Sequence, residues 1–270
     1  MSPDASWTFE PGAIALTAIA GYVYVRRWRA ARAQAGPRAA SGWRLVSFMA
    51  GLVAVLIALV SPVDRLADQL LLMHMVQHLL LLDVAAILLI LGLTRVILRP
   101  VTRYLEPAER RAGVIGHPVT AVVLYVGIMW VWHIPALYDA AVRHAPLHVL
   151  EHLTMATAGL LYWWHILGPI RSRLRLSGMA PMAYMGSTKL LVGILGIVLT
   201  FAPEALYPYY EHQPHYWGLT PSEDEAIAGL IMALEQSIIM GIAAAWLFMK
   251  LLGESEREEQ RAERYAGVET

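Results

Sequence analysis

Seven long apolar blocks constrain the fold of this chain more than any other feature. Each block is close to the roughly 20 residues that an α-helix needs to cross the hydrocarbon core of a bilayer. They lie at about residues 9–25, 43–60, 70–92, 118–135, 147–167, 182–202 and 226–249. Of the 270 residues, 57% are apolar and 16% are charged. We therefore predict an all-α, multi-pass membrane protein, built as a bundle of seven transmembrane helices in a lipid bilayer.

The blocks use nearly the whole chain, with no internal repeat and no linker long enough to divide it. We predict one domain over residues 1–270, in which residues 251–270 form a charged cytoplasmic tail. This tail mixes charges of both signs, so it is expected to extend the last helix into water. Arginines follow the first block instead of preceding it, and no small-residue cleavage site is evident. The first block is therefore predicted to be a membrane helix and not a signal peptide.

The basic residues predict the orientation of the bundle. Around the first, third and fifth loops and after the last block lie 18 of the 21 Lys and Arg residues. The loops on the other side hold only Arg65 and Arg143. Because cytoplasmic loops carry the excess of Lys and Arg, we predict that the N-terminus is outside and the C-terminus is cytoplasmic. Topology accounts for the basic loops, so we expect no nucleic-acid binding.

Five histidines lie in or beside the apolar blocks. His74 and His78 are four residues apart, as are His148 and His152, and residues four apart share one face of a helix. His133 lies at the outer end of the fourth block. A single membrane histidine is commonly a packing residue, but three helices that present histidine at one level predict a metal or cofactor site in the outer leaflet.

Other polar residues gather in the outer loops. His144, His212 and His215 are interpreted as loop residues that capture incoming metal. Four tyrosines are interpreted as an interfacial belt, namely Tyr207, Tyr209, Tyr210 and Tyr216.

The composition narrows the choice of metal. The chain has no cysteine, which excludes thiolate ligands and disulfides. Imidazole suits copper, zinc and iron, whereas a thioether adds a preference for Cu(I). Methionines adjoin the histidines at Met73, Met75, Met129 and Met155. Copper is therefore the first expectation, with iron or zinc as the alternative.

Haem is a competing cofactor. A membrane cytochrome holds haem between histidines of two helices, and His152 and His165 have a suitable separation within one helix. No second helix carries a matching pair. The spacing of four on two helices favours a compact ion site.

Several motifs together resemble the CtaG family. They are HMVQHLLLLDVAAILLILG at His74–Gly92, WHIPALYDAAVRHAPLHVLEH at Trp132–His152, the following LLYWWHILGP, His117–Pro118 and LYPYY at Leu206–Tyr210. The members of this family are seven-helix proteins associated with assembly of caa-type cytochrome c oxidase.

The resemblance implies a location in the bacterial cytoplasmic membrane and a role in supplying or inserting copper. The implied partner is the oxidase subunit that carries the copper centre. By the match of motifs, the family's characteristic histidines are His74, His78, His133, His148 and His152, with Glu151 beside them.

Three charged residues inside the blocks depart from the family pattern: Asp83, Lys189 and Glu235. Asp83 and Lys189 are both about thirteen residues from the outer boundary. Because a lone charge near the middle of a bilayer is costly, we predict that they form a structural ion pair. In the alternative interpretation, Asp83 and Glu235 join Glu151 as carboxylate ligands or supporting groups, or relay protons. Histidine with carboxylate suits iron or zinc.

The first functional hypothesis is therefore a copper metallochaperone, an assembly factor and not an enzyme. The alternatives are a membrane-embedded histidine–carboxylate metalloenzyme, a haem-binding electron-transfer protein and a metal-free scaffold. A homo-oligomer is compatible with each of them.

Overall fold

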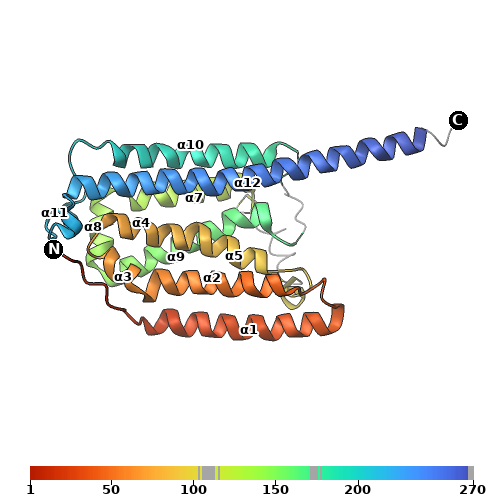
Figure 1. Ribbon diagram of the computed structural model, residues 1–270, viewed down its shortest axis with the longest axis horizontal. Coiled ribbons are helices and arrows are strands. Elements are labelled where there is room, and N and C mark those ends of the chain that lie inside the picture. Colours follow the sequence, from red (N-terminus) through yellow and green to blue (C-terminus); the bar gives the residue numbers. More distant parts are fainter. Residues whose placement is uncertain (103, 105–112, 115, 171–175, 177, 267–270) are drawn as a thin grey trace.

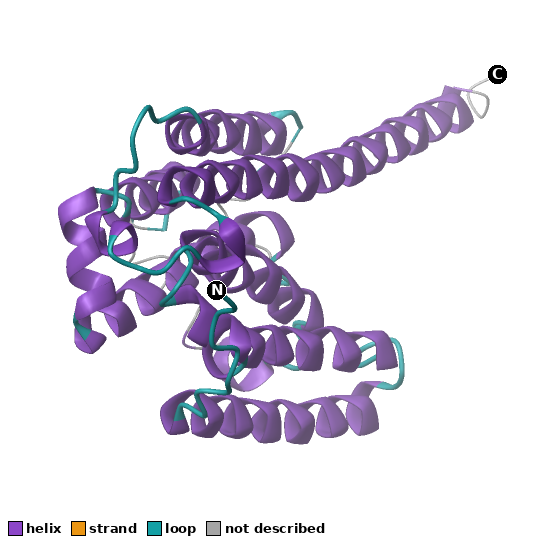
Figure 2. Ribbon diagram, turned by 60° about the vertical axis from the view of Figure 1, so that its left-hand side comes forward, coloured by secondary structure: helices purple, strands orange, loops and turns teal. Residues whose placement is uncertain are grey.

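The computed structural model describes residues 1–102, 104, 113–114, 116–170, 176 and 178–266. The regular elements of this part of the chain are all helices, and none of its residues forms a strand. Figure 1 shows long helices that run side by side, with the last helix projecting beyond the rest. Figure 2 shows the same helices from a second direction. The all-α prediction is confirmed.

The first half of the chain supplies two long helices and one interrupted helix. The long helices are α1 (Pro11–Ala35) and α2 (Gly42–Val60), and the short α3 (Pro62–Ala67) follows them. The interrupted helix consists of α4 (Leu71–Leu79), the π-helical η1 (Leu80–Ala85) and α5 (Ala86–Gly92). A π-helical turn holds one more residue than an α-turn and is often found at functional sites.

The second half contains three long helices and several short ones. The long helices are α9 (Ala145–Leu167), α10 (Ala180–Thr200) and α12 (Pro221–Ala266). The shorter ones are α7 (Pro118–Trp132), α8 (Pro135–Arg143), α11 (Pro208–Glu211) and η2 (Tyr216–Gly218). Proline begins or nearly begins most of these helices, where its fixed φ fits and its missing N–H is not needed.

The predicted helix at 118–135 is shorter than expected. The helix ends at Trp132, and the chain bends by 77° into α8. The cause is Pro135, because a residue before proline is driven out of the helical region. Ile134 indeed has an extended backbone, with φ −65° and ψ 121°.

Four helices are long and apolar enough to span a membrane among the described residues: α2, the run Leu71–Gly92, α10 and Pro221–Gly253 of α12. The bent pair α7–α8 would make a fifth span. The multi-pass character is thus supported, whereas the seven predicted spans are not all reproduced. α1 carries four arginines and α9 begins with polar side chains, which lowers the apolar character of both helices.

The last helix is longer than its apolar block. α12 has 46 residues and continues to Ala266, so the charged tail extends the helix as predicted. Residues 267–270 of the predicted tail lie outside the described part of the chain.

The N-terminus lies at the end of the bundle formed by α3, α8 and α11, here called the α11 end (Figure 1). The amino group of Met1 donates to the carbonyl oxygen of His215 at 3.2 Å, and the Trp217 N–H donates to the carbonyl oxygen of Met1 at 3.1 Å. These bonds tie the N-terminus to the segment before α12.

Arginines mark the opposite end of the bundle. Arg44 donates to the carbonyl oxygens of Leu91 and Leu93, both at 2.8 Å, where α5 ends. Six other arginines lie outside the described residues: Arg103, Arg110, Arg111, Arg171, Arg173 and Arg175. The described arginines thus agree with a separation of charge between the two ends, on which the predicted orientation rests.

Candidate metal centre

The structure brings all five predicted histidines together. His74 and His78 share one face of α4, and their ring centroids are 4.4 Å apart. His148 and His152 share one face of α9, with centroids 4.3 Å apart. Across the two helices, the His74–His148 and His78–His152 centroid distances are 5.2 and 5.7 Å. His133 follows α7, and its ring is 6.2 Å from that of His78.

A carboxyl group lies at the centre of this histidine cluster. The Nε2 atoms of His74 and His78 are 2.9 Å apart, so one ring donates its proton to the other. Glu151 Oε1 is 3.4 Å from His78 Nε2, and Glu151 Oε2 is 3.8 Å from His74 Nε2. The side chains of all three residues are at most 1% exposed. Two ring nitrogens and a carboxylate therefore converge in a space closed to solvent.

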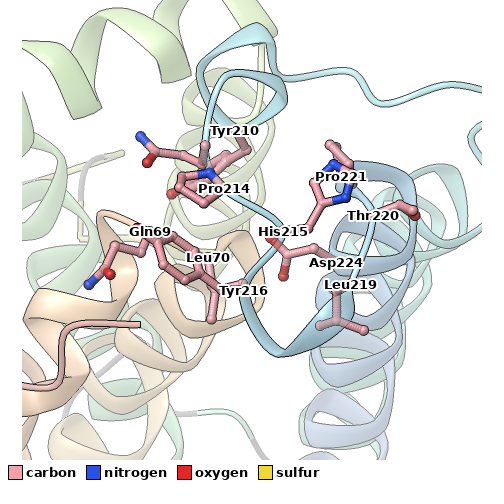
Figure 3. A pocket seen from close by; sticks show the side chains of 11 residues that line it. Gln69, Leu70, Tyr210, Pro214, His215, Tyr216, Leu219, Thr220, Pro221 and Asp224 are labelled. Atoms are coloured by element: carbon pink, nitrogen blue, oxygen red, sulfur yellow. The ribbon is translucent and has the colours of Figure 1, made fainter. Parts of the chain in front are cut away.

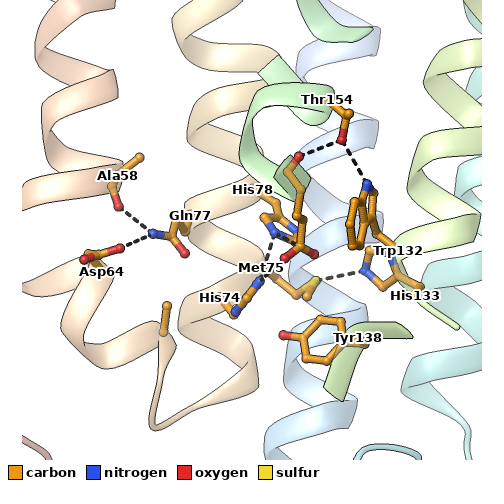
Figure 4. Close-up of polar contacts among 12 residues, drawn as sticks. Ala58, Asp64, His74, Met75, Gln77, His78, Trp132, His133, Tyr138 and Thr154 are labelled. Atoms are coloured by element: carbon orange, nitrogen blue, oxygen red, sulfur yellow. Dashed lines mark hydrogen bonds and ion pairs between the residues drawn. The ribbon is translucent and has the colours of Figure 1, made fainter. Parts of the chain in front are cut away.

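Backbone and sulfur contacts orient His133, and Figure 4 shows the contact with the sulfur of Met75. Its Nδ1 is 2.6 Å from the carbonyl oxygen of Met129, which accepts a hydrogen bond, so Nδ1 carries the proton. The lone pair is then on Nε2, which lies 3.2 Å from the sulfur of Met75. A backbone bond of this kind fixes the tautomer of metal-binding histidines. Of the methionines beside the histidines, Met75 thus provides a thioether at the cluster.

Several buried atoms of the cluster that could bind a metal lack a hydrogen-bond partner among the described protein groups. They are Nδ1 of His78, Nε2 of His148, Nε2 of His152 and both carboxyl oxygens of Glu151. A buried polar atom without a hydrogen bond costs about 1–3 kcal/mol, and native proteins hold few of them. Their concentration in one place is explained if a cation completes the cluster.

The donor geometry fits a metal ion. In one group, single donor atoms of His74, His78 and His152 lie within 4.8 Å of one another. In a second group, donor atoms of His74, His148 and Glu151 do so. Imidazole and carboxylate are common ligands of transition metals. His74 belongs to both groups, so the cluster offers overlapping sites.

Asp224 of α12 and Asp64 of α3 hold α4 in position. Asp224 of α12 is 4% exposed, and its carboxylate accepts hydrogen bonds from the backbone N–H groups of Leu71 and Leu72 at 2.7 and 3.0 Å. These N–H groups begin α4 and have no partner within the helix. On another face, Gln77 donates to Ala58 O and to Asp64 Oδ1 at 2.8 and 2.6 Å. The sequence did not single out Asp224 or Gln77 for this role.

We expect Asp224→Ala to lower the stability of the protein by about 1–2 kcal/mol, because two N–H groups of α4 lose their acceptor. Thermal unfolding in detergent measures the change. Asp224→Asn is the matched control, since its amide oxygen still accepts a hydrogen bond, and a smaller loss is expected. An Asp224→Ala protein that melts with the wild type would contradict this role.

Tyrosines cover the cluster at the α11 end. Tyr207 donates to the carbonyl oxygen of His133 at 3.1 Å, and Tyr210 donates to that of Ala67 at 2.7 Å. The Tyr210 hydroxyl is also 3.4 Å from Nδ1 of His74. Both side chains are buried, at 1% and 5% exposure, so their interpretation as an interfacial belt is wrong. The bend into α8 adds Tyr138, whose ring is 5.0 Å from that of His74 and which the sequence did not single out.

A surface pocket lies on the other side of Tyr210 (Figure 3). Tyr210, Asp224 and the predicted capture residue His215 all line it. Tyr210 thus contacts both this pocket and His74 of the cluster.

Acidic residues of α3 lie near the same end. Burial raises the pKa of Asp68 to about 6, and the neighbouring charge of Asp64 contributes. Burial also raises the pKa of Asp64, which is hydrogen-bonded to Gln77. Near pH 6 Asp68 therefore carries less negative charge than an exposed aspartate.

The structure does not form the predicted ion pair between Asp83 and Lys189. Asp83 is fully buried in η1 and accepts hydrogen bonds from Tyr125, Trp163 and Gln236 instead. Lys189 is exposed on α10 and donates to Ser237 at 3.1 Å. The physical reason is that neutral donors already satisfy Asp83, so it needs no cation.

Neither Asp83 nor Glu235 belongs to the two donor groups of the cluster. The carboxyl group that the structure places among the histidines is that of Glu151. Glu151 adjoins His152 in the sequence and was predicted to lie beside the histidines.

The family model of the cytochrome c oxidase caa3 assembly factor matches residues 22–254. This chain belongs to that family. The matched range contains every histidine of the cluster and Glu151. An uncharacterized protein of Mycobacterium leprae (strain TN) is 25% identical over 96% of this chain and 41% of its own length.

An uncharacterized protein of Mycobacterium bovis is 27% identical over 46% of this chain and 21% of its own length. The chain thus covers about two fifths or less of the length of these curated relatives. No solved structure matches it.

Proposed function

We propose that this assembly factor binds copper at the histidine cluster and passes it to the oxidase subunit that carries the copper centre. The observation that carries the proposal is the set of buried, unpartnered donor atoms on His148, His152 and Glu151, which face the paired rings of His74 and His78. Because the chain belongs to an oxidase assembly family, we infer that an oxidase subunit receives the copper.

The donor set favours copper. Imidazole binds both oxidation states of copper, and the thioether of Met75, 3.2 Å from His133 Nε2, suits Cu(I). Binding requires deprotonated ligands, so copper would displace the proton shared by His74 and His78. With no cysteine in the chain, no thiolate holds the ion, which favours release to another protein.

The surroundings of the cluster support exchange from one end of the bundle. The cluster lies at the α11 end, together with the N-terminus, and the pocket beside Tyr210 opens there. On the predicted orientation this is the outer face of the bacterial cytoplasmic membrane. An ion would enter and leave past the side chain of Tyr210, without crossing the bundle.

A second candidate is a histidine–carboxylate metalloenzyme that uses iron or zinc. The observation that favours it is the position of Glu151 between His74 and His78, because carboxylate ligands suit iron and zinc better than Cu(I). Metal identity separates the two functions.

The test begins with the metal content of the full chain, purified from native membranes without added metal. Copper is expected, and copper-loaded protein should then load the apo form of the purified oxidase subunit that carries the copper centre. His152→Ala should abolish the transfer, whereas His144→Ala, at an exposed loop position, should retain it. Iron or zinc in the purified protein would favour the metalloenzyme. A metal-free chain that supports oxidase assembly would overturn both functions in favour of a scaffold.

A further inference from the structure

Two carboxyl groups lie inside helices that are long and apolar enough to span a membrane, and neither belongs to the histidine cluster. Asp83 lies in η1, twelve residues beyond the start of α4, and Glu235 lies fourteen residues beyond the start of α12. At 1.5 Å per residue, both are roughly 20 Å along their helices, deep in a hydrocarbon core of about 30 Å. Ionisable residues at such depth are expensive and are usually functional.

Asp83 is surrounded by hydrogen-bond donors. The Tyr125 hydroxyl lies 2.9 and 2.8 Å from its two oxygens, Trp163 Nε1 donates at 2.6 Å, and Gln236 Nε2 donates at 3.2 Å. Donors from three helices, α7, α9 and α12, thus converge on one carboxyl group. Short hydrogen bonds of this kind stabilise the ionised form of a carboxyl group.

Glu235 has the opposite surroundings. Both of its carboxyl oxygens are buried, and neither has a hydrogen-bond partner among the described groups. An ionised carboxylate without donors is strongly disfavoured in an apolar interior. The surroundings of Glu235 therefore fit a protonated carboxylic acid, which carries its own donor.

Gln236 contacts Asp83 and directly follows Glu235 in α12, so both carboxyl groups lie in the same part of the bundle. This side chain is 2% exposed, and its amide nitrogen also donates to the Tyr125 hydroxyl at 2.9 Å. Its Oε1 is buried without a partner, like both oxygens of Glu235. The amide hydrogens of Gln236 are directed at Asp83 and Tyr125, and the Tyr125 hydroxyl is directed at Asp83. These groups therefore offer Glu235 no hydrogen, and a proton bound to Glu235 itself supplies the missing donor.

We propose that Asp83 and Glu235 form a proton-binding site within the membrane, in which Asp83 is ionised and Glu235 holds one exchangeable proton. Uptake forms the O–H bond of Glu235 with a proton from water, and release breaks it, while no other covalent bond changes. The site does not depend on copper, since it shares no ligand with the histidine cluster.

The described groups around Asp83 and Glu235 provide no positive charge that would neutralise an ionised Asp83. Titratable side chains on the adjoining helices include Tyr125 of α7, Tyr162 of α9, and Tyr184 and Lys189 of α10. Lys189 is exposed and donates to Ser237, so it does not pair with Asp83. Because Glu235 adjoins Gln236, which is bonded to Asp83, a second negative charge near an ionised Asp83 is opposed.

Infrared spectroscopy of the full, metal-free chain tests the proposal. A protonated carboxyl group has a C=O band that shifts in heavy water. At neutral pH, Glu235→Gln should remove the intensity of one protonated carboxyl group from the wild-type spectrum. Glu204→Gln, at an exposed loop position, is the matched control and should remove none. Glu151→Gln measures how much of the carboxyl band comes from Glu151 in the histidine cluster.

Asp83→Asn gives a second, independent result. Without the neighbouring negative charge, the Glu235 band should persist but disappear at a lower pH than in the wild type. A folded Glu235→Gln protein that keeps the full carboxyl intensity would overturn the proposal. If that variant does not fold, Glu235→Asp must shift the band, and an unchanged spectrum would refute the site. An Asp83→Asn protein with the wild-type titration would refute the pairing.

Discussion

Replacing His78 by alanine is expected to weaken copper binding by more than about 100-fold, since loss of a group that only supports a ligand already costs about 10- to 100-fold. His78 occupies the middle of the cluster. Its Nε2 contacts both His74 and Glu151, and its ring faces those of His133 and His152. Competition against a copper chelator of known affinity measures the change.

The matched control is His212→Ala, at an exposed position of the segment after α11. It removes one histidine as well, but no donor of the cluster, so the wild-type affinity is expected. The fold of His78→Ala should persist, because an alanine removes a buried polar group that has an unpartnered Nδ1. If the folded variant holds copper as tightly as the wild type, the ion binds elsewhere.

The histidine cluster was predictable because it follows from helical periodicity. A spacing of four residues places His74 with His78 and His148 with His152 whatever the details of packing. The position of His133 followed from its place at the end of an apolar block. In the structure each of the five rings lies within 6.2 Å of at least one other, measured between ring centroids.

The contacts of individual polar side chains were less predictable. The depth of Asp83 and Lys189 along their helices suggested an ion pair, but depth does not specify which face of a helix a residue occupies. Asp83 lies on an inner face of η1 and Lys189 on an outer face of α10. Likewise, the tyrosines near 207–210 have the composition of an interfacial belt, whereas the fold of α11 packs Tyr207 and Tyr210 over the cluster.

The long apolar blocks predicted most helices, but local irregularities depend on packing and on the backbone. The bend before α8 has a signal in Pro135. The π-helical turn at Leu80–Ala85 has no comparable signal, since its residues are ordinary for an apolar helix. It becomes understandable only from the position of Asp83 between three donor-bearing helices and from the close approach of α9.

That close approach predicts the second large effect. Gly159 of α9 faces η1, and a Cβ atom at this position would overlap the carbonyl oxygen of Leu82 and lie 2.7 Å from its carbonyl carbon. Both obstacles are backbone atoms, so no side-chain rotation relieves the overlap. We expect Gly159→Ala to destabilise the protein by about 1–3 kcal/mol, in the range of other overpacked cores. The melting temperature in detergent should fall by about 2–4 °C for each kcal/mol.

The same substitution should weaken metal binding without changing any ligand. α9 carries His148, Glu151 and His152, whereas His78 lies two residues before η1, so separating α9 from η1 spreads the two halves of the cluster. Gly193→Ala is the matched control, because a Cβ atom at this position of α10 meets no atom within 4 Å. It should be neutral or slightly stabilising, since alanine favours a helix more than glycine does. Equal melting temperatures and equal metal affinities for the two variants would show that the contact between α9 and η1 does not hold the cluster together.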